Sequence, residues 1–374
     1  MRRPRPRRVQ WALAAWVYLG LVPVLAMLRL TGRTASKLGW AMRRRERRLA
    51  ALDPLGGYAP GPQDVFVATY PKSGTNWMLQ VVHQLIHHGE GAFDHIHDVV
   101  PWPEAERSPW FLRGHAVALA AADDWTRAPE PLRAIKTHLP WERLPYDPRA
   151  RYVVVIRDPK DVVVSSYHFV RDAVLGPAMP PVDAWYRMFL EGSSLGGSWG
   201  VHAAGYWAQR HRPNVLIVSF KAMKRDLPGT VARVAAFLGI TASDDVLRRV
   251  CAQASFAHMK AIDHKFHLGR LIPWRAPGAM LRKGAEHGGA ELLSLEQRRA
   301  LEHAREEAGR RHERGLVELA VGLAVRDERL RRGPEIARLV VVAACGLTGL
   351  RARERGHDAR RDGGQIRGRR REDR

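Results

Sequence analysis

Four short apolar runs in the middle of the chain have the length of β-strands. The run YVVVI at residues 152–156 is hydrophobic at every position, which is typical of a strand covered on both faces of its sheet. The other runs are VFVATY at residues 65–70, RAIKT at residues 133–137 and VLIVSF at residues 215–220. These segments predict the strands of one sheet.

Helical patterns separate and follow these runs. Apolar residues spaced three and four apart define one helix face after the first run, and they are Met78, Val81, Val82, Leu85 and Ile86. Pro228 and Gly239 suit the first turn and the end of a second helix. Ser294 and Gln297 have the spacing of a capping box, which predicts a long charged helix reaching into the 320s. This alternation predicts an α/β domain of three layers, in which helices flank a central parallel sheet.

The N-terminal residues 1–53 form a basic segment that contains an apolar stretch. Residues 9–28 include no charged side chain, and 20 residues at about 1.5 Å each are enough for one helix to cross a bilayer. Gln10, Gly20 and Pro23 interrupt this stretch, so a surface or core helix is the alternative. Arginines on both sides leave its orientation open. We predict a membrane-anchor helix over residues 9–28.

The C-terminal residues 336–374 differ from the middle of the chain. Their apolar part ends at residue 350 and is too short to span a bilayer comfortably, which favours a docked helix or a re-entrant contact. Residues 351–374 have almost no apolar side chains and predict a disordered basic tail. Between these ends, residues 54–335 form the predicted catalytic domain.

The net charge is concentrated at the two ends. The 374 residues carry +23, of which residues 1–53 hold +11 and residues 351–374 hold +5, leaving +7 for the rest. This distribution is typical of membrane-facing or solvated arms and does not indicate a specific nucleic-acid site. With 45% hydrophobic and 26% charged residues, the composition excludes wholesale disorder and a multi-span membrane protein. Cys251 and Cys345 are far apart and lack ligand spacing, so we expect neither a disulfide scaffold nor a zinc module.

The first predicted strand leads directly into the polar loop PKSGTNW. A strand, a tight loop and a helix point backbone N–H groups and the positive end of the helix at an anion. Lys72 adds a cation, Gly74 permits close approach of the backbone, and further donors are Ser73, Thr75 and Asn76. The loop is P-loop-like but lacks the GxxxxGK[ST] pattern, which disfavours an ordinary ATPase. A capped turn without a ligand is the alternative.

At this loop the chain resembles the sulfotransferases that use 3′-phosphoadenosine 5′-phosphosulfate (PAPS), and in particular their cytosolic-type domain, whose loop has the form PKSGTxW. Three further motifs follow in the family's order. KTHLP occupies residues 136–140, Arg157 precedes Ser165 by eight residues, and RKG occupies residues 282–284, without the family's usual GDW after it. The resemblance covers residues 64–305 and implies PAPS as co-substrate, with no metal required.

The resemblance implies that three residues are catalytic. His138 removes the proton of the acceptor, a hydroxyl or an amine, and Lys72 and Lys136 polarise the transferring group and its leaving oxygen. These residue types suit sulfuryl transfer, because the acceptor must lose a proton while negative charge builds up on the departing phosphate.

The resemblance also assigns the donor-binding residues. Those implied for the 5′-phosphate are Lys72, Ser73, Gly74, Thr75 and Asn76. Those implied for the 3′-phosphate are Arg157, Ser165, Arg282, Lys283 and Gly284. Trp77 and Phe256 are expected to flank the adenine, and Phe220 lies where relatives often carry a tyrosine, so a hydroxyl contact is lost there.

The acceptor is less well specified. Two segments, residues 93–125 and 176–202, are expected to form an apolar acceptor pocket or to pack as a lid, and their tryptophans are Trp102, Trp110, Trp125, Trp185 and Trp199. An anchor would favour a lipid-linked or apolar acceptor. The donor is normally made in the cytoplasm, so we expect the catalytic domain there. Two other functions stay open, a P-loop-type kinase or NTPase and a non-catalytic basic anion-binding protein. The sequence does not specify an oligomeric state.

Overall fold

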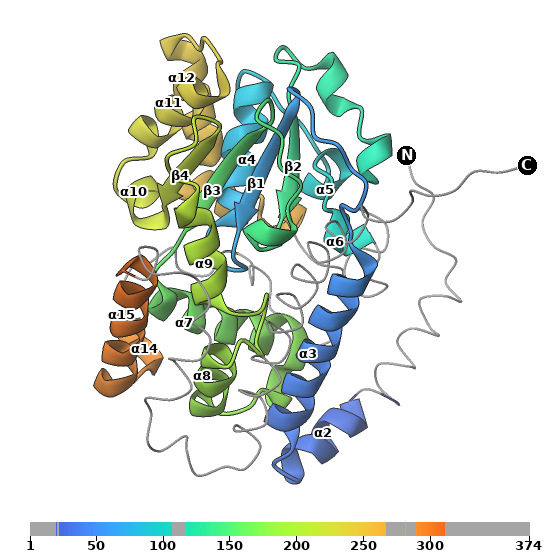
Figure 1. Ribbon diagram of the computed structural model, residues 1–374, viewed down its shortest axis with the longest axis vertical. Coiled ribbons are helices and arrows are strands. Elements are labelled where there is room, and N and C mark those ends of the chain that lie inside the picture. Colours follow the sequence, from blue (N-terminus) through green and yellow to red (C-terminus); the bar gives the residue numbers. More distant parts are fainter. Residues whose placement is uncertain (1–19, 21, 107–116, 267–280, 282–288, 311–374) are drawn as a thin grey trace, which may run out of the picture. The chain divides into compact units, whose positions relative to one another are not determined.

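The computed structural model describes residues 20, 22–106, 117–266, 281 and 289–310 (Figure 1). Most of the predicted anchor, the motif Arg282-Lys283-Gly284 and the C-terminal residues 336–374 lie outside these residues. Among the described helices, none combines the length and the apolar character that crossing a bilayer requires.

A parallel sheet of four strands forms the centre of the fold, as predicted. Its strands are β1 (Asp64–Thr69), β2 (Arg133–Thr137), β3 (Arg151–Ile156) and β4 (Val215–Ser219), in the order β2-β1-β3-β4. Ala68 of β1 lies opposite Thr137 of β2 and Val154 of β3. Because of this register, all the strands end at one level, and the residues that follow them meet at one edge of the sheet.

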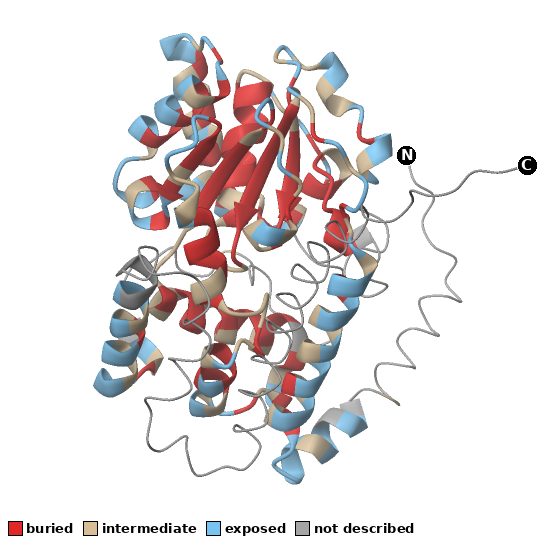
Figure 2. Cartoon of the chain, viewed as in Figure 1, coloured by how far each residue is buried: buried red, intermediate tan, exposed pale blue. Residues whose placement is uncertain are grey.

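Both faces of the sheet are buried, which accounts for the unbroken apolar strands (Figure 2). Val65 and Val67 of β1 pack into the core beneath α4 (Thr75–Ile86), α11 (Leu227–Leu238) and α12 (Asp244–Ala254). Phe66 and Ala68 point to the opposite face and pack with Tyr206 of α9 (Trp199–Ala208). Each large apolar side chain buried in this way stabilises the fold by about 1.5–3 kcal/mol. The three-layer α/β architecture is confirmed.

A further core lies beyond the carboxyl edge of the sheet. It joins α7 (Pro159–Val170), α8 (Val182–Leu190), α9 and α15 (Leu295–Arg310). Trp185 is fully buried there, and its Nε1 donates to Ser166 Oγ over 3.0 Å. This core supports α7, the helix that follows β3.

The remaining elements are short or peripheral. The other α-helices are α2 (Val22–Leu30), α3 (Thr34–Leu52), α5 (Ile96–Val99), α6 (Pro103–Glu106), α10 (Phe220–Arg225), α13 (Phe256–Ala261) and α14 (Gly289–Leu292). Single turns are η2 (Leu119–Ala121), η3 (Asp124–Arg127), η4 (Trp141–Arg143), η5 (Arg171–Leu175), η6 (Gly176–Ala178) and η7 (Asp263–Phe266).

Local capping explains where several helices begin and end. Gln297 N donates to Ser294 Oγ and Ser294 N donates to Gln297 Oε1, so the predicted capping box starts α15. The expected continuation of this helix into the 320s lies outside the described residues. Gly239 ends α11 with a φ of 74°. The fourth strand stops earlier than predicted, because Ser219 Oγ accepts from Ala222 N and caps α10, which makes Phe220 helical.

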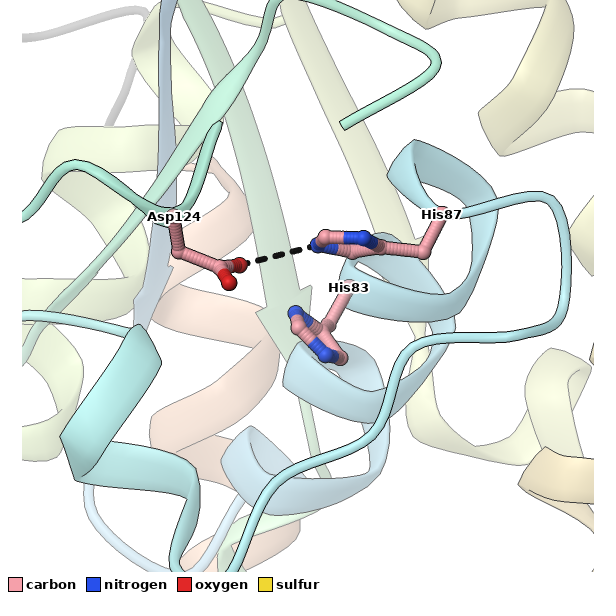
Figure 3. Close-up of side chains that lie close together, drawn as sticks. All are labelled: His83, His87 and Asp124. Carbon is pink, nitrogen blue, oxygen red and sulfur yellow. Dashed lines mark hydrogen bonds and ion pairs between the residues drawn. The ribbon is translucent and has the colours of Figure 1, made fainter. Parts of the chain in front are cut away.

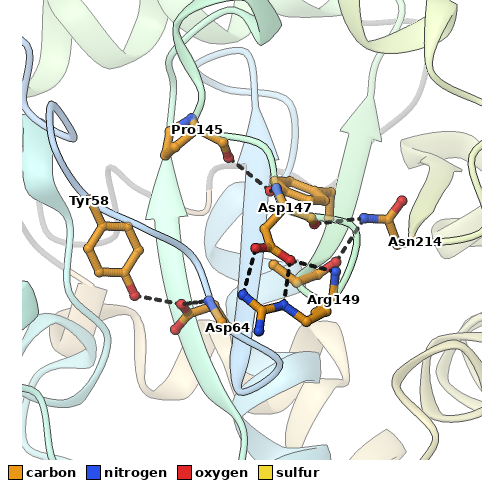
Figure 4. Close-up of polar contacts among 9 residues, drawn as sticks. Tyr58, Asp64, Pro145, Asp147, Arg149 and Asn214 are labelled. Atoms are coloured by element: carbon orange, nitrogen blue, oxygen red, sulfur yellow. Dashed lines mark hydrogen bonds and ion pairs between the residues drawn. The ribbon is translucent and has the colours of Figure 1, made fainter.

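Polar contacts fix the opposite, amino-terminal edge of the sheet (Figure 4). Asp64 accepts from Tyr58 Oη over 2.5 Å and pairs with the guanidinium of Arg133 over 2.8 Å. Asn214 Nδ2 donates to the carbonyl groups of Asp147 and Ala150. The first contacts join the entrances of β1 and β2, and the second join those of β3 and β4.

Candidate active site

The loop between β1 and α4 has a backbone that only a few residue types adopt. Lys72 has a φ of 69° and Gly74 a φ of 105°. A Cβ atom at Gly74 would lie 2.7 Å from the ring of Phe220, so a side chain would meet both a clash and backbone strain there. Glycine therefore lets the loop pass directly against Phe220.

This loop presents unsatisfied polar groups at the start of a helix. Thr75 is the first residue of α4, where backbone N–H groups lack partners within the helix. Ser73 Oγ is buried and has no hydrogen-bond partner among the described residues, while Ser73 N donates to Tyr70 O. The hydroxyl groups of Thr69 and Thr75 lie 2.5 Å apart and fix each other. An orphaned hydroxyl beside a helix N-terminus fits an anionic group such as a phosphate.

Lys72 is half-buried beside this helix start. Its Nζ lies 4.2 Å from the centroid of the Phe169 ring. Burial first, and the charge of Arg157 second, lower the pKa of Lys72 to about 8. An ammonium group held in this apolar and cationic setting is poised to pair with an anion.

His138 directly follows β2 and its ring is held in one orientation. Its Nδ1 lies 2.7 Å from the carbonyl oxygen of Thr69, so Nδ1 carries the proton and donates, and Nε2 has the free lone pair. Burial first, and the charge of Lys136 second, hold the pKa of His138 well below its usual value. The ring is therefore neutral at pH 7 and its Nε2 can accept a proton.

Lys136 reaches the same place from within β2. Its Nζ lies 3.5 Å from the centroid of the Trp102 ring and 3.3 Å from His97 Nε2. Burial lowers the pKa of Lys136 to about 7. Trp102 packs edge-on against His138 as well, so one aromatic ring positions two of the predicted catalytic residues.

Glu104 is a functional candidate that the sequence analysis missed. Its buried Oε1 accepts from His138 N over 2.6 Å and from Thr137 Oγ1 over 2.9 Å. Burial raises the pKa of this carboxyl. Glu104 thus fixes the backbone that carries His138. No local motif marks it, because the contact spans 34 residues of the chain.

Arg157 follows β3 and contacts both the loop between β1 and α4 and the ring of Phe220. Its Nη1 donates to the carbonyl of Lys72 over 3.0 Å, and its guanidinium lies 4.2 Å from the centroid of the Phe220 ring. Ser165 lines the cavity two turns into α7, while the neighbouring Ser166 bonds with Val163 O in the core. The two adjacent serines thus have different locations, one at the cavity and one in the core.

A cavity of about 790 Å³ joins these residues at the carboxyl edge of the sheet. The predicted site residues that line it are Lys72, Gly74, Thr75, Asn76, Trp77, Lys136, His138, Arg157, Ser165, Phe220 and Phe256. Ser73 is buried beneath the lining. Trp77 Nε1 donates to Ala254 O over 2.7 Å, which fixes its ring, whereas Phe256 is 44% exposed. Nearly all described candidates thus share one cavity.

The cavity wall also includes a part of the chain that sequence reasoning placed outside the catalytic domain. Helix α3 contributes Met42, Arg45, Glu46 and Leu49. Their spacing of three and four residues is the signal of one helix face, but the charged run RRRERR hid it. The proposed boundary at residue 53 stays a prediction.

The tryptophans of the two predicted acceptor segments have different locations. Trp102 lines the cavity. Trp185 and Trp199 pack in the core around α7 to α9, and Trp125 lies against the guanidinium of Arg133. Trp110 lies outside the described residues. Packing thus accounts for most of these described tryptophans.

Comparison with known proteins finds one family. A family model described as "Sulfotransferase domain" matches residues 62–303. Sulfotransferase 2B1 of Mus musculus is 31% identical over 251 residues, which cover 62% of this chain and 70% of that protein. The amine sulfotransferase of Oryctolagus cuniculus is 30% identical, and the match covers 66% of this chain and 80% of that protein. For sulfotransferase 2B1 of Homo sapiens the identity is 32%, and the match spans 59% of either chain.

Solved structures show the same fold. Retinol dehydratase in complex with androsterone and the inactive cofactor PAP has a TM-score of 0.55 and 25% identity, and the match covers 70% of this chain and 85% of that one. Mouse sulfotransferase SULT7A1 complexed with PAP has a TM-score of 0.52 and 24% identity, covering 74% and 91%. The family match includes the loop between β1 and α4 (the anion loop), His138 and Arg157. It extends over more than half of the sequence, so the chain belongs to the sulfotransferase family.

Proposed function

We propose that this chain transfers the sulfuryl group of PAPS to the hydroxyl or amine of an acceptor. The observation that carries the proposal is the convergence of a neutral histidine with Lys72 and Arg157 in one cavity. The relatives support it: two of the similar structures were crystallised with PAP, the 3′-phosphoadenosine 5′-phosphate that remains when PAPS loses its sulfuryl group.

His138 acts as the general base in this proposal. Its Nε2 takes the proton of the acceptor while the acceptor oxygen or nitrogen forms a bond to sulfur. The bond from sulfur to the 5′-phosphate oxygen breaks, and that oxygen leaves with the electron pair. Lys72 and Lys136 neutralise the charge on the leaving oxygen, and Glu104 holds the backbone of His138 in place.

Arg157 and Ser165 are proposed to bind the 3′-phosphate. Arg157 is largely buried, and its position is fixed by Lys72 O and by the Phe220 ring. A guanidinium presents several donors in one plane, which suits a phosphate. We propose that Trp77 and Phe256, which line the same cavity, flank the adenine.

Binding of PAP at pH 8.5 is expected to take up protons. Lys72 and Lys136, with pKa values lowered to about 8 and about 7, are mostly neutral in the free chain at this pH. A phosphate beside them raises both pKa values again, because an opposite charge favours the ammonium form. Calorimetry in two buffers of different ionisation enthalpy should give an uptake of about 0.5 to 2 protons.

The variant Lys72→Arg serves as the control for this prediction. Arginine keeps the positive charge and does not titrate near pH 8.5, so the uptake should fall. Heats that are independent of the buffer in the unaltered chain would contradict the proposed contact between phosphate and lysine.

We propose further that the acceptor is apolar and reaches the cavity at a membrane surface. The cavity wall includes Met42 and Leu49 of α3. On α2 and α3, Leu30 is 87% exposed and Trp40 50% exposed, close in sequence to the basic run at residues 43–48. Exposed apolar side chains with a basic rim are typical of helices that bind anionic membranes.

An acceptor assay tests both parts of this proposal. The full chain with PAPS should release PAP in the presence of androsterone or retinol, and faster with anionic than with neutral vesicles. Leu30→Asp should remove the effect of the vesicles and leave the rate in their absence unchanged. If neither acceptor stimulates the release of PAP, the proposed transferase activity is overturned. Equal rates with both kinds of vesicle would overturn only the membrane contact.

A further inference from the structure

Three potential metal ligands meet at the far end of α4 from the anion loop (Figure 3). His83 and His87 are four residues apart and therefore neighbours on the helix, and their ring centroids are 4.4 Å apart. Asp124 comes from η3, and its Oδ2 lies 2.9 Å from His87 Nε2. One ligand atom from each of the three residues lies within 4.8 Å of the others.

The cluster contains an orphaned nitrogen. His83 is only 3% exposed, and its Nε2 has no hydrogen-bond partner among the described residues. This nitrogen therefore has no competing hydrogen bond within the described part of the chain. His87 and Asp124 are 16% and 34% exposed in their side chains, so an ion can enter from solvent.

The residue types suit a cation. An imidazole offers a nitrogen lone pair and an aspartate offers a carboxylate oxygen. Two imidazoles and one carboxylate are a common ligand set for zinc, which binds them at about 2.0–2.2 Å and leaves a fourth position to water.

We propose that His83, His87 and Asp124 bind one zinc ion. The ion joins the end of α4 to η3, 37 residues further along the chain. His83 lies eight residues after Thr75, which places it about 12 Å along the helix axis from the anion loop. The site is therefore separate from the transfer reaction. The sequence analysis expected no zinc module, because the two cysteines lack ligand spacing, and it did not consider these three residues.

Titration with Co²⁺ tests the proposal, because this ion gives a visible absorption in zinc sites. Untagged full chain, stripped with a chelator, should bind one Co²⁺ that Zn²⁺ displaces. His87→Ala and Asp124→Asn should each weaken binding by more than about 10-fold, since loss of a partner that merely supports a ligand already costs this much. Zinc should also raise the melting temperature of the unaltered chain and not that of either variant.

His88→Asn provides a matched control. His88 is adjacent to the cluster, pairs with Glu130 over 2.7 Å and has a φ of 53°, which asparagine tolerates. This variant should bind Co²⁺ as the unaltered chain does. The proposal is overturned if the unaltered chain binds less than one equivalent of Co²⁺, or if His87→Ala and Asp124→Asn bind it as tightly as His88→Asn.

Discussion

Replacement of His138 by glutamine is expected to reduce kcat for sulfuryl transfer by about 10²- to 10⁴-fold. In the unaltered chain, the hydrogen bond from Nδ1 to Thr69 O leaves Nε2 of His138 available as the base. Glutamine has no basic nitrogen at this position. Glutamine keeps a donor for the same carbonyl, so the packing against Trp102 should change little. Single-turnover kinetics with PAPS measure the chemical step directly.

Two controls separate this loss from a loss of folding. His211 is exposed and does not line the cavity, so His211→Gln should leave kcat unchanged. PAP binding to His138→Gln should stay within about twofold of the unaltered chain, because the proposed base acts on the acceptor. If His138→Gln keeps full activity, another group, or water, takes the proton of the acceptor.

The second large effect is expected at Arg157. Its replacement by alanine removes a guanidinium that is proposed to make charge-assisted hydrogen bonds with the 3′-phosphate. Such bonds contribute about 1.5–3 kcal/mol each, so PAP should bind about 10- to 100-fold more weakly. The comparison with AMP is decisive, because AMP has the same adenosine and 5′-phosphate but no 3′-phosphate.

The comparison with AMP also separates the support that Arg157 gives to the loop from its proposed binding of the 3′-phosphate. Arg157 supports the loop through Lys72 O and stacks on Phe220, and a collapsed loop would weaken PAP and AMP alike. We expect that only PAP loses affinity, and that Ser165→Ala has the same effect to a smaller degree. Equal losses for PAP and AMP would reduce Arg157 to a residue that supports the loop.

The strands and most of the site could be predicted because their signals are local. Runs of apolar residues of strand length mark the buried strands, and most of the described site residues directly follow a strand or lie in the helix after it. In a parallel sheet such positions meet at one edge. The family's motifs then gave those positions their expected roles, and the family match sets aside the kinase and the non-catalytic alternatives.

The parts that escaped prediction depend on contacts between distant segments. Glu104 reaches His138 from a short helix without a motif, and α3 lines the cavity from a segment that looked like a charged arm. Phe220 begins a helix rather than ending a strand, because the hydroxyl of Ser219 caps it. Asp124 and the two histidines of α4 come together only in three dimensions.

The most direct test of the central claim is calorimetric binding of PAP, ADP and AMP to the full chain. We expect PAP to bind about 10- to 100-fold more tightly than AMP, since the proposed site reads the 3′-phosphate through Arg157. ADP should resemble AMP. Equal affinities for all three nucleotides would contradict the account and leave the loop after β1 as a general phosphate site.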